Sequence, residues 1–210
     1  MKPIYVCLFA LLLVLCLTGK AQDIRSNTEG FSVNLNPSYS SWSSESVFLG
    51  SLDDLEPTGL GIYAKVAYGF TQNIEVYVGY GIESFNREVD WDTYRSGTFD
   101  LGGRFNFGAT LRPLRPFAEV ALSIHDMTID PIAFDGSTEV FNLNVQGSSF
   151  TAGLGLHYFL LSNLSLTLVG KGSFGSFGTA FLSGEEVLGL DESLDFEMYR
   201  IHLGATYFFE

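Results

Sequence analysis

The stretch LDFEMYRIHLGATYFF, residues 194–209, decides the fold because it alternates without a break and ends on aromatic residues. Every second side chain from Tyr199 onward is apolar or aromatic, whereas the positions between them carry Arg200 and His202. A period of two residues is that of a β-strand with two different faces. Only Glu210 follows the aromatic end. The pattern predicts a strand with an apolar and a polar face, and a strand of a soluble sandwich is the alternative.

The N-terminal segment has the pattern of a secretory signal peptide. Lys2 gives a positive start, residues 4–17 form an almost unbroken apolar run, and small residues precede a cleavage point. The run is shorter than the ~20 residues that a spanning helix needs. A lipoprotein anchor on Cys16 is a second alternative. We expect residues 1–21 to be removed and residues 22–210 to form a single domain.

The composition of the remaining chain limits the classes of partner that it can bind. Cys7 and Cys16 would leave with the signal, so the mature chain would have no disulfide. The formal net charge of -13 would become -15, because Lys2 and Lys20 are also removed. Phosphate would repel such an acidic chain, which excludes nucleic acid as a partner. No later segment is apolar enough to span a membrane as a helix, so insertion would be by strands.

Seven earlier segments alternate like the terminal one, with connections that are long and short in turn. The expected strands are residues 31–42, 59–70, 74–83, 99–109, 118–125, 150–159, 164–174 and 194–209. Long loops such as 86–96 and 126–147 would lie at one end, and short turns at the other end with both termini. Aromatic side chains cluster at both ends of the apolar faces, as in membrane girdles. We expect an all-β fold, an eight-stranded antiparallel up-and-down transmembrane β-barrel; a lipocalin-like soluble barrel would have inverted faces.

Four stretches carry a likeness to a known family: YGFTQNIEVYVGYG (68–81), RPFAEVALS (115–123), GLGLHYFLLSNLSLTL (153–168) and HLGATYFF (202–209). With them the chain resembles the small OmpA/OmpX-type barrels, and specifically the outer membrane protein beta-barrel domains common in Bacteroidetes. The resemblance implies secretion to the bacterial outer membrane, contact with its lipids and lipopolysaccharide, and assembly by the barrel-insertion machinery. It also implies an assembly signal in the last strand, which His202, Gly204, Tyr207 and Phe209 match in spacing, although the family usually ends on the aromatic residue.

Eight charged side chains fall on the inward faces of the expected strands. They are Lys65, Glu75, Glu83, Asp100, Arg104, Glu119, Lys171 and Arg200. The interior of an eight-stranded barrel is about filled by side chains, and unpaired charges there are costly. Four charges of each sign predict an internal ion-pair network and no general solute pore, and a proton or ion path is the alternative.

Enzymatic residues are weakly indicated. By parity His125, His157 and His202 all face inward, and His125 with Asp126 at the outer rim is the one candidate acid/base pair. A lipid A or phospholipid-modifying enzyme is therefore the alternative function. The charges at Lys65 and Arg104 argue against an apolar slot for an acyl chain. No cofactor-binding motif and no defined metal motif is present.

The expected long loops hold most of the negative charge. Their acidic residues are Glu45, Asp53, Asp54, Glu56, Asp126, Asp130, Asp135, Glu139, Glu185, Glu186, Asp191, Glu192 and Asp195. We expect a solvated acidic surface, and divalent cations that bridge these carboxylates to lipopolysaccharide are the alternative. Apolar residues among them suggest contact with an extracellular or periplasmic protein partner. We expect a non-enzymatic barrel that acts in envelope integrity, surface interaction or assembly of an envelope or secretion system.

Overall fold

The computed structural model describes residues 26–44, 57–86, 92–133, 140–186 and 194–209. The expected signal peptide and many of the acidic and apolar loop residues lie outside the described residues. The described strands are β1 (Gly30–Ser43), β2 (Thr58–Gly69), β3 (Ile74–Phe85), β4 (Thr93–Asn106), β5 (Leu114–Ala133), β6 (Val140–Leu161), β7 (Leu164–Leu182), β8 (Glu185–Glu186) and β9 (Leu194–Phe208). This part of the chain contains no helix long and apolar enough to cross a membrane.

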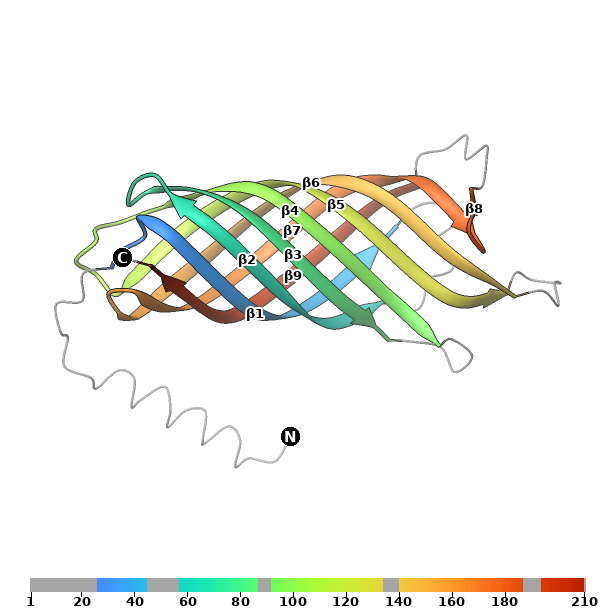
Figure 1. Cartoon of the computed structure of the whole chain (residues 1–210), viewed down its shortest axis with the longest axis horizontal. Helices are drawn as coiled ribbons and strands as arrows, with labels where there is room; N and C mark the ends of the chain where they lie inside the picture. Colours follow the sequence, from blue (N-terminus) through green and yellow to red (C-terminus); the bar gives the residue numbers. More distant parts are fainter. Residues whose placement is uncertain (1–25, 45–56, 87–91, 134–139, 187–193, 210) are drawn as a thin grey trace, which may run out of the picture.

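Eight of these strands close into a barrel in which every neighbouring pair is antiparallel (Figure 1). Sequential strands pair from β1 to β7, β7 pairs with β9, and β9 pairs with β1 to close the wall. The two-residue strand β8 stays outside this closure and pairs only with the end of β7. Because closure leaves no edge along the shared length of the strands, their backbone donors and acceptors bond to one another. The expected fold class is confirmed.

The wall has an apolar outer surface and a largely polar inner surface. Along β3, buried and exposed residues alternate at every position from Ile74 to Phe85. The outward side chains are large and apolar, and Leu60 and Leu154 are 70% and 72% exposed. Exposed aromatic residues form a girdle near each end of this surface, as the sequence pattern predicted. They are Tyr68, Phe70, Phe107, Tyr158, Tyr207 and Phe209 towards the short turns, and Tyr80, Phe99, Phe150, Phe174 and Tyr199 towards the long loops. This surface suits a hydrocarbon solvent.

Several strands are longer than the sequence pattern predicted. The expected loop at 126–147 is wrong in most of its length, because β5 continues to Ala133 and β6 begins at Val140. Likewise β4 begins at Thr93, inside the expected loop 86–96, and β7 continues to Leu182. Figure 1 shows β5, β6 and β7 reaching beyond their neighbours at the end away from the C-terminus. We call this part the extension and that end of the barrel the long-loop end.

The sequence pattern did not predict the extension because the apolar side chains move there from the outward face of the strand to the inward face. On β5 the outward face changes from apolar Ile124 to Asp126 and Thr128, whereas the inward face becomes apolar at Met127 and Ile129. A strand whose outward positions are polar does not match the pattern of a lipid-facing strand, so its sequence resembles that of a polar loop. The residues 114–116 were also expected in a turn, but they belong to β5. Pro116 is accommodated because β4 has already ended beside it.

The opposite end, with the short turns, is bound together by the segment that precedes β1. Ser26 donates from its backbone to the carbonyl of Thr110, and Asn27 donates to the carbonyl of Ser162. The backbone of Thr28 donates to Gln72 Oε1 at 3.0 Å. These acceptors lie in the three short turns, so residues 26–28 connect all of them.

Candidate functional site

The lumen is filled by three layers of side chains. Near the short turns lie amides, hydroxyls, His157 and aromatic rings; the middle holds an ion-pair network; and the long-loop end holds an apolar plug. All eight charged residues that parity placed inward lie inside the barrel, and none is more than 5% exposed. Inward projection from a closed wall brings seven of them into one ion-pair network, which among the described residues does not include Glu83.

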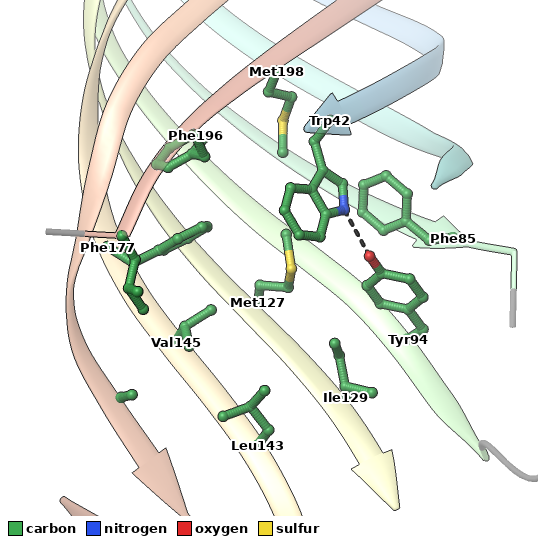
Figure 2. Packing of buried hydrophobic residues seen from close by; sticks show 12 residues of the cluster. Trp42, Phe85, Tyr94, Met127, Ile129, Leu143, Val145, Phe177, Phe196 and Met198 are labelled. Carbon is green, nitrogen blue, oxygen red and sulfur yellow. Dashed lines mark hydrogen bonds between the residues drawn. The ribbon is translucent and has the colours of Figure 1, made fainter. Parts of the chain in front are cut away.

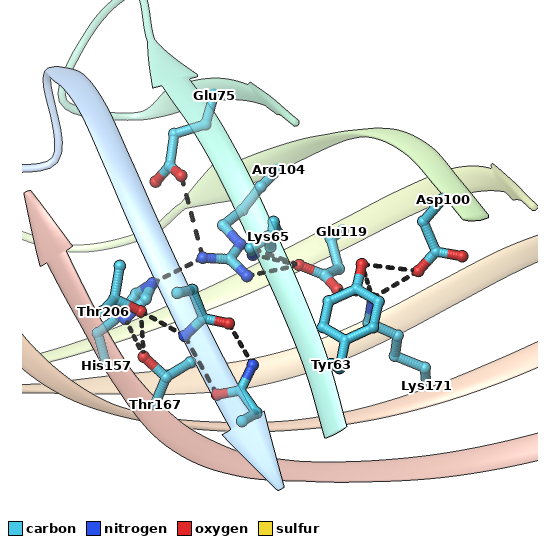
Figure 3. Close-up of polar contacts among 12 residues, drawn as sticks. Tyr63, Lys65, Glu75, Asp100, Arg104, Glu119, His157, Thr167, Lys171 and Thr206 are labelled. Carbon is cyan, nitrogen blue, oxygen red and sulfur yellow. Dashed lines mark hydrogen bonds and ion pairs between the residues drawn. The ribbon is translucent and has the colours of Figure 1, made fainter. Parts of the chain in front are cut away.

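Glu119 is the centre of the ion-pair network (Figure 3). Its Oε2 accepts from Arg104 Nη2 at 2.7 Å and lies 3.6 Å from Lys65 Nζ. Its Oε1 lies 2.9 Å from Lys171 Nζ. One carboxylate from β5 thus contacts cations from β2, β4 and β7. These contacts favour the register in which the four strands bring the charges together. Such a set resists separation because removing any one member leaves another charge buried without its partner.

Asp100 forms the second centre of the network. Its Oδ2 lies 3.0 Å from Lys171 Nζ, and its Oδ1 lies 3.5 Å from Arg200 Nη2. Tyr63 donates to Oδ2 at 2.8 Å and Ser123 donates to Oδ1 at 2.7 Å. Lys171 therefore joins the two carboxylate centres, and its ammonium also lies 4.5 Å from the centre of the Tyr63 ring.

The remaining two carboxylates are less fully paired. Glu75 lies 3.9 Å from Arg104 Nη1 and accepts a hydrogen bond from Asn106. Glu83 accepts from Ser38 Oγ at 3.4 Å, and the described residues give it no ion pair within 4 Å. The network is consequently dense around Glu119 and sparse towards the long-loop end.

Arg115 is a further buried cation, which the sequence analysis missed. Its side chain is fully buried at the short-turn end of β5. Its Nη1 donates to Thr28 Oγ1 at 2.9 Å, and its Nη2 donates to the carbonyl of Gln72 at 2.5 Å. The sequence placed Arg115 in a turn, and only the parity of an extended β5 could have revealed it.

The apolar plug is the second feature that the sequence analysis did not predict. It comprises Trp42, Phe85, Tyr94, Met127, Ile129, Leu143, Val145, Phe177, Ala180, Leu194, Phe196 and Met198, all at most 3% exposed (Figure 2). Trp42 Nε1 donates to the hydroxyl of Tyr94 at 2.7 Å. The rings of Phe177 and Phe196 stack with centroids 4.3 Å apart. Side chains from seven barrel strands thus close the lumen at the long-loop end.

His125 and Asp126 are not brought together. The His125 side chain is fully buried in the lumen, where its ring nitrogens lie 3.3 Å from Thr98 Oγ1 and 2.8 Å from Ser149 Oγ. Asp126 is the next residue of β5 and points to the outer face, where its Oδ2 accepts from Asn144 and Gln146 at 3.0 and 3.2 Å. The wall separates the two side chains, so they form no acid/base pair in this structure.

The two other histidines also lie in the lumen. His157 Nε2 lies 2.8 Å from Arg104 Nη1, and its Nδ1 lies within 3.0 Å of Ser165 and Thr167 hydroxyls. His202 packs edge-on against Tyr63 with centroids 4.6 Å apart. No group of three or more His, Cys, Asp or Glu in the described ranges is arranged to hold a metal ion.

The four residues of the expected assembly signal lie along β9 and just beyond it. His202 points into the lumen, whereas Tyr207 and Phe209 are outward and about half exposed. Gly204 lies where β9 approaches β1 closely, because a Cβ there would collide with the Leu35 carbonyl and with Asn36. Tyr207 and Phe209 therefore belong to the aromatic girdle at the short-turn end of the barrel.

Comparison with known proteins identifies the architecture. No protein-family model matches the chain, and no curated protein matches it either. Among solved structures, it is similar to Neisserial surface protein A (14% identity, TM-score 0.60, covering 86% of this chain and 98% of that one). It is also similar to outer membrane protein OprG from Pseudomonas aeruginosa (13%, 0.56, 88% and 98%) and to Ail, the attachment invasion locus protein of Yersinia pestis (11%, 0.50, 86% and 100%). The chain thus has the fold of small bacterial outer-membrane barrels.

Proposed function

We propose that this chain is a non-enzymatic barrel of the bacterial outer membrane that presents its long-loop end outside the cell for surface interaction. The closed wall anchors the protein, and the extension carries the interacting loops beyond the lipid. Envelope integrity and assembly of an envelope or secretion system are the alternative roles for the same barrel.

The outer surface supports insertion in a membrane. Its apolar side chains are bounded by aromatic girdles at both ends, which is the arrangement that lipid-facing strands require. The structures with which it shares its fold come from bacterial surface and outer-membrane proteins. Short turns and both ends of the described chain lie at one end of the barrel (Figure 1), as expected if that end faces the periplasm.

The filled lumen is the observation that carries the proposal. Ion pairs around Glu119 occupy the middle, and the plug around Trp42 occupies the long-loop end. A lumen filled with side chains in this way supports a function on the outer surfaces of the barrel. It also argues against a diffusion porin, which needs an open lumen.

The outer face of the extension supports contact with an aqueous or polysaccharide-rich exterior. Above Ile124 the outward positions of β5 become polar at Asp126 and Thr128. Asn144 Nδ2 of β6 donates to Asp126 Oδ2 and to Thr128 Oγ1 at 3.0 and 3.1 Å, whereas Val140 at the start of β6 is apolar and exposed. Amides, hydroxyls and carboxylates in this position bond equally well to water and to sugars. The extension thus suits a segment that leaves the hydrocarbon.

Epitope insertion tests the orientation that the proposal requires. A short epitope replaces residues 134–139 in one variant and 187–193 in a second, and the matched control carries it in the turn at 71–73. Antibody should bind intact cells that carry either loop insertion and should reach the control only after the outer membrane is permeabilised. Binding of the control on intact cells would overturn the proposed orientation.

A comparison of cells that lack the protein with cells that carry it separates the candidate roles. Loss of attachment to host cells without increased detergent sensitivity indicates surface interaction, and increased detergent sensitivity indicates envelope integrity. Mass spectrometry of lipid A tests the enzymatic alternative. An acyl-chain difference that His125→Ala abolishes would contradict a non-enzymatic role, for which the lumenal position of His125 argues.

A further inference from the structure

A ring of polar side chains with unused hydrogen-bonding capacity lies directly beneath the apolar plug. Ser40 Oγ, Glu83 Oε2, Ser96 Oγ and Arg200 Nε and Nη1 make no hydrogen bond to any described residue. All four residues are at most 1% exposed. A buried polar atom without a partner costs free energy, so several in one place indicate that something else satisfies them.

The register places these four residues at one level of the lumen. On β1, β3, β4 and β9 each of them lies two positions from a plug residue on the same strand: Ser40 below Trp42, Glu83 below Phe85, Ser96 below Tyr94, and Arg200 below Met198. Ser40 is the direct cross-strand partner of Arg200, and Glu83 is the partner of Ser96. These four residues therefore form one boundary layer beneath the plug, and further buried atoms without a hydrogen bond to a described residue lie on Tyr77, Asn106, Arg115 and Glu119 closer to the short turns.

His202 extends this layer towards the ion-pair network. Both of its ring nitrogens lack a hydrogen-bond partner among the described residues, although the side chain is fully buried. Its direct partner across β1 is Ser38, whose hydroxyl donates to Glu83. Tyr63 packs against the imidazole and closes the layer on its other side. The layer thus lies between the plug and the ion pairs of Asp100.

The donor and acceptor inventory decides what can occupy the layer. Glu83 offers a carboxylate acceptor, Arg200 offers guanidinium donors, the hydroxyls do both, and a neutral imidazole has one donor and one acceptor. One charge of each sign faces the layer, so an added ion would meet a repelling partner. The occupant must be small and neutral and must both donate and accept, and water has this chemistry.

We propose that the barrel binds a cluster of internal water molecules in the layer formed by Ser40, Glu83, Ser96, Arg200 and His202. The waters bridge the Glu83 carboxylate to the Arg200 guanidinium, which form no ion pair within 4 Å of each other. The plug separates the cluster from the exterior. The site is independent of the surface role proposed above, since it concerns only the lumen.

Radiolytic footprinting of the purified, folded barrel in detergent tests this site, because hydroxyl radicals formed from bound water oxidise the side chains beside it. Met198 and Tyr63 should be oxidised despite their burial. The double variant Ser40→Ala with Ser96→Ala removes two hydroxyls with little change in volume and should lower oxidation of Met198 severalfold. Oxidation of Phe159, which is buried towards the short turns, is the internal control and should not change.

A high-resolution crystal structure of the unmodified protein gives a second readout that does not depend on any variant. Ordered water within hydrogen-bond distance of Glu83 Oε2 and of Arg200 would support the site. A direct ion pair between Glu83 and Arg200, with the layer dry, would overturn it. Unchanged oxidation of Met198 in the folded double variant would also overturn it.

Discussion

Trp42 and Tyr94 join two strands that are not neighbours in the sheet, since the indole of β1 donates to the phenol of β4 at 2.7 Å. The bond crosses the lumen inside an apolar surrounding, where an unpaired indole N–H would be costly. It therefore fixes the shape of the plug as well as filling space.

The plug should be a major source of stability. Trp42→Ala should lower the free energy of unfolding by about 3–5 kcal/mol, because it leaves a large cavity. Trp42→Phe retains an aromatic ring and should cost about 1–3 kcal/mol, chiefly from the lost hydrogen bond. Urea titration of the refolded barrel, followed by the mobility shift of folded protein on unboiled SDS gels, measures both. Equal effects of the two substitutions would contradict a packing role.

Glu119 should be the charged residue least tolerant of substitution. Glu119→Ala removes the carboxylate shared by Arg104, Lys65 and Lys171, and should cost about 3–5 kcal/mol because buried cations lose their partner. Glu186→Ala, at an exposed position of β8, is the matched control and should change stability by less than about 0.5 kcal/mol. The same urea titration compares them, and a neutral result for Glu119→Ala would refute the network as described.

The cost in stability of adding a charge to the outer surface should depend on its position along the barrel axis. Leu203→Arg places a cation in the middle of the apolar belt and should cost about 2–4 kcal/mol in lipid vesicles. Gln146→Arg lies on the polar face of the extension and should cost at most about 1 kcal/mol. Unfolding titrations in vesicles measure the difference. If both substitutions cost the same, the membrane boundary lies elsewhere.

Gly204 should be required for closure of the barrel itself. Gly204→Ala places a methyl against the Leu35 carbonyl and the Asn36 backbone at the β1–β9 seam. We expect a lower yield of folded barrel in detergent, where no insertion machinery is present. The matched control Gly170→Ala meets open space and should fold normally. Normal folding of Gly204→Ala in detergent, with failure only in cells, would instead indicate that Gly204 serves recognition alone.

The sequence predicted most of the wall because lipid-facing strands keep a strict period of two. Alternation around Val76 and Leu203 identified the strands, and parity placed Lys65, Asp100 and Glu119 inward. It did not predict the height of β5 to β7, because Met127 and Ile129 are apolar on the inward face while Asp126 and Thr128 are polar outside. A prediction that requires the apolar side chains to stay on the outward face therefore ends the strand where they move to the inward face.

The interior contacts were harder to predict than the interior residues. Lys171 and Asp100 pair at 3.0 Å although 71 positions separate them, and that pairing depends on register and shear around the closed barrel. The plug escaped notice for a related reason. Trp42, Phe85 and Tyr94 come from strand ends that look like separate loop margins in the sequence, and only closure brings them together.

Conductance of the purified barrel in planar lipid bilayers tests whether the closed wall has a lumen filled from end to end. Folding of the barrel before reconstitution is established first by the mobility shift of the folded protein on an unboiled gel. We expect the reconstituted barrel to lack the stepwise conductance of a diffusion porin. Stable open channels on that scale from the unmodified protein would contradict it.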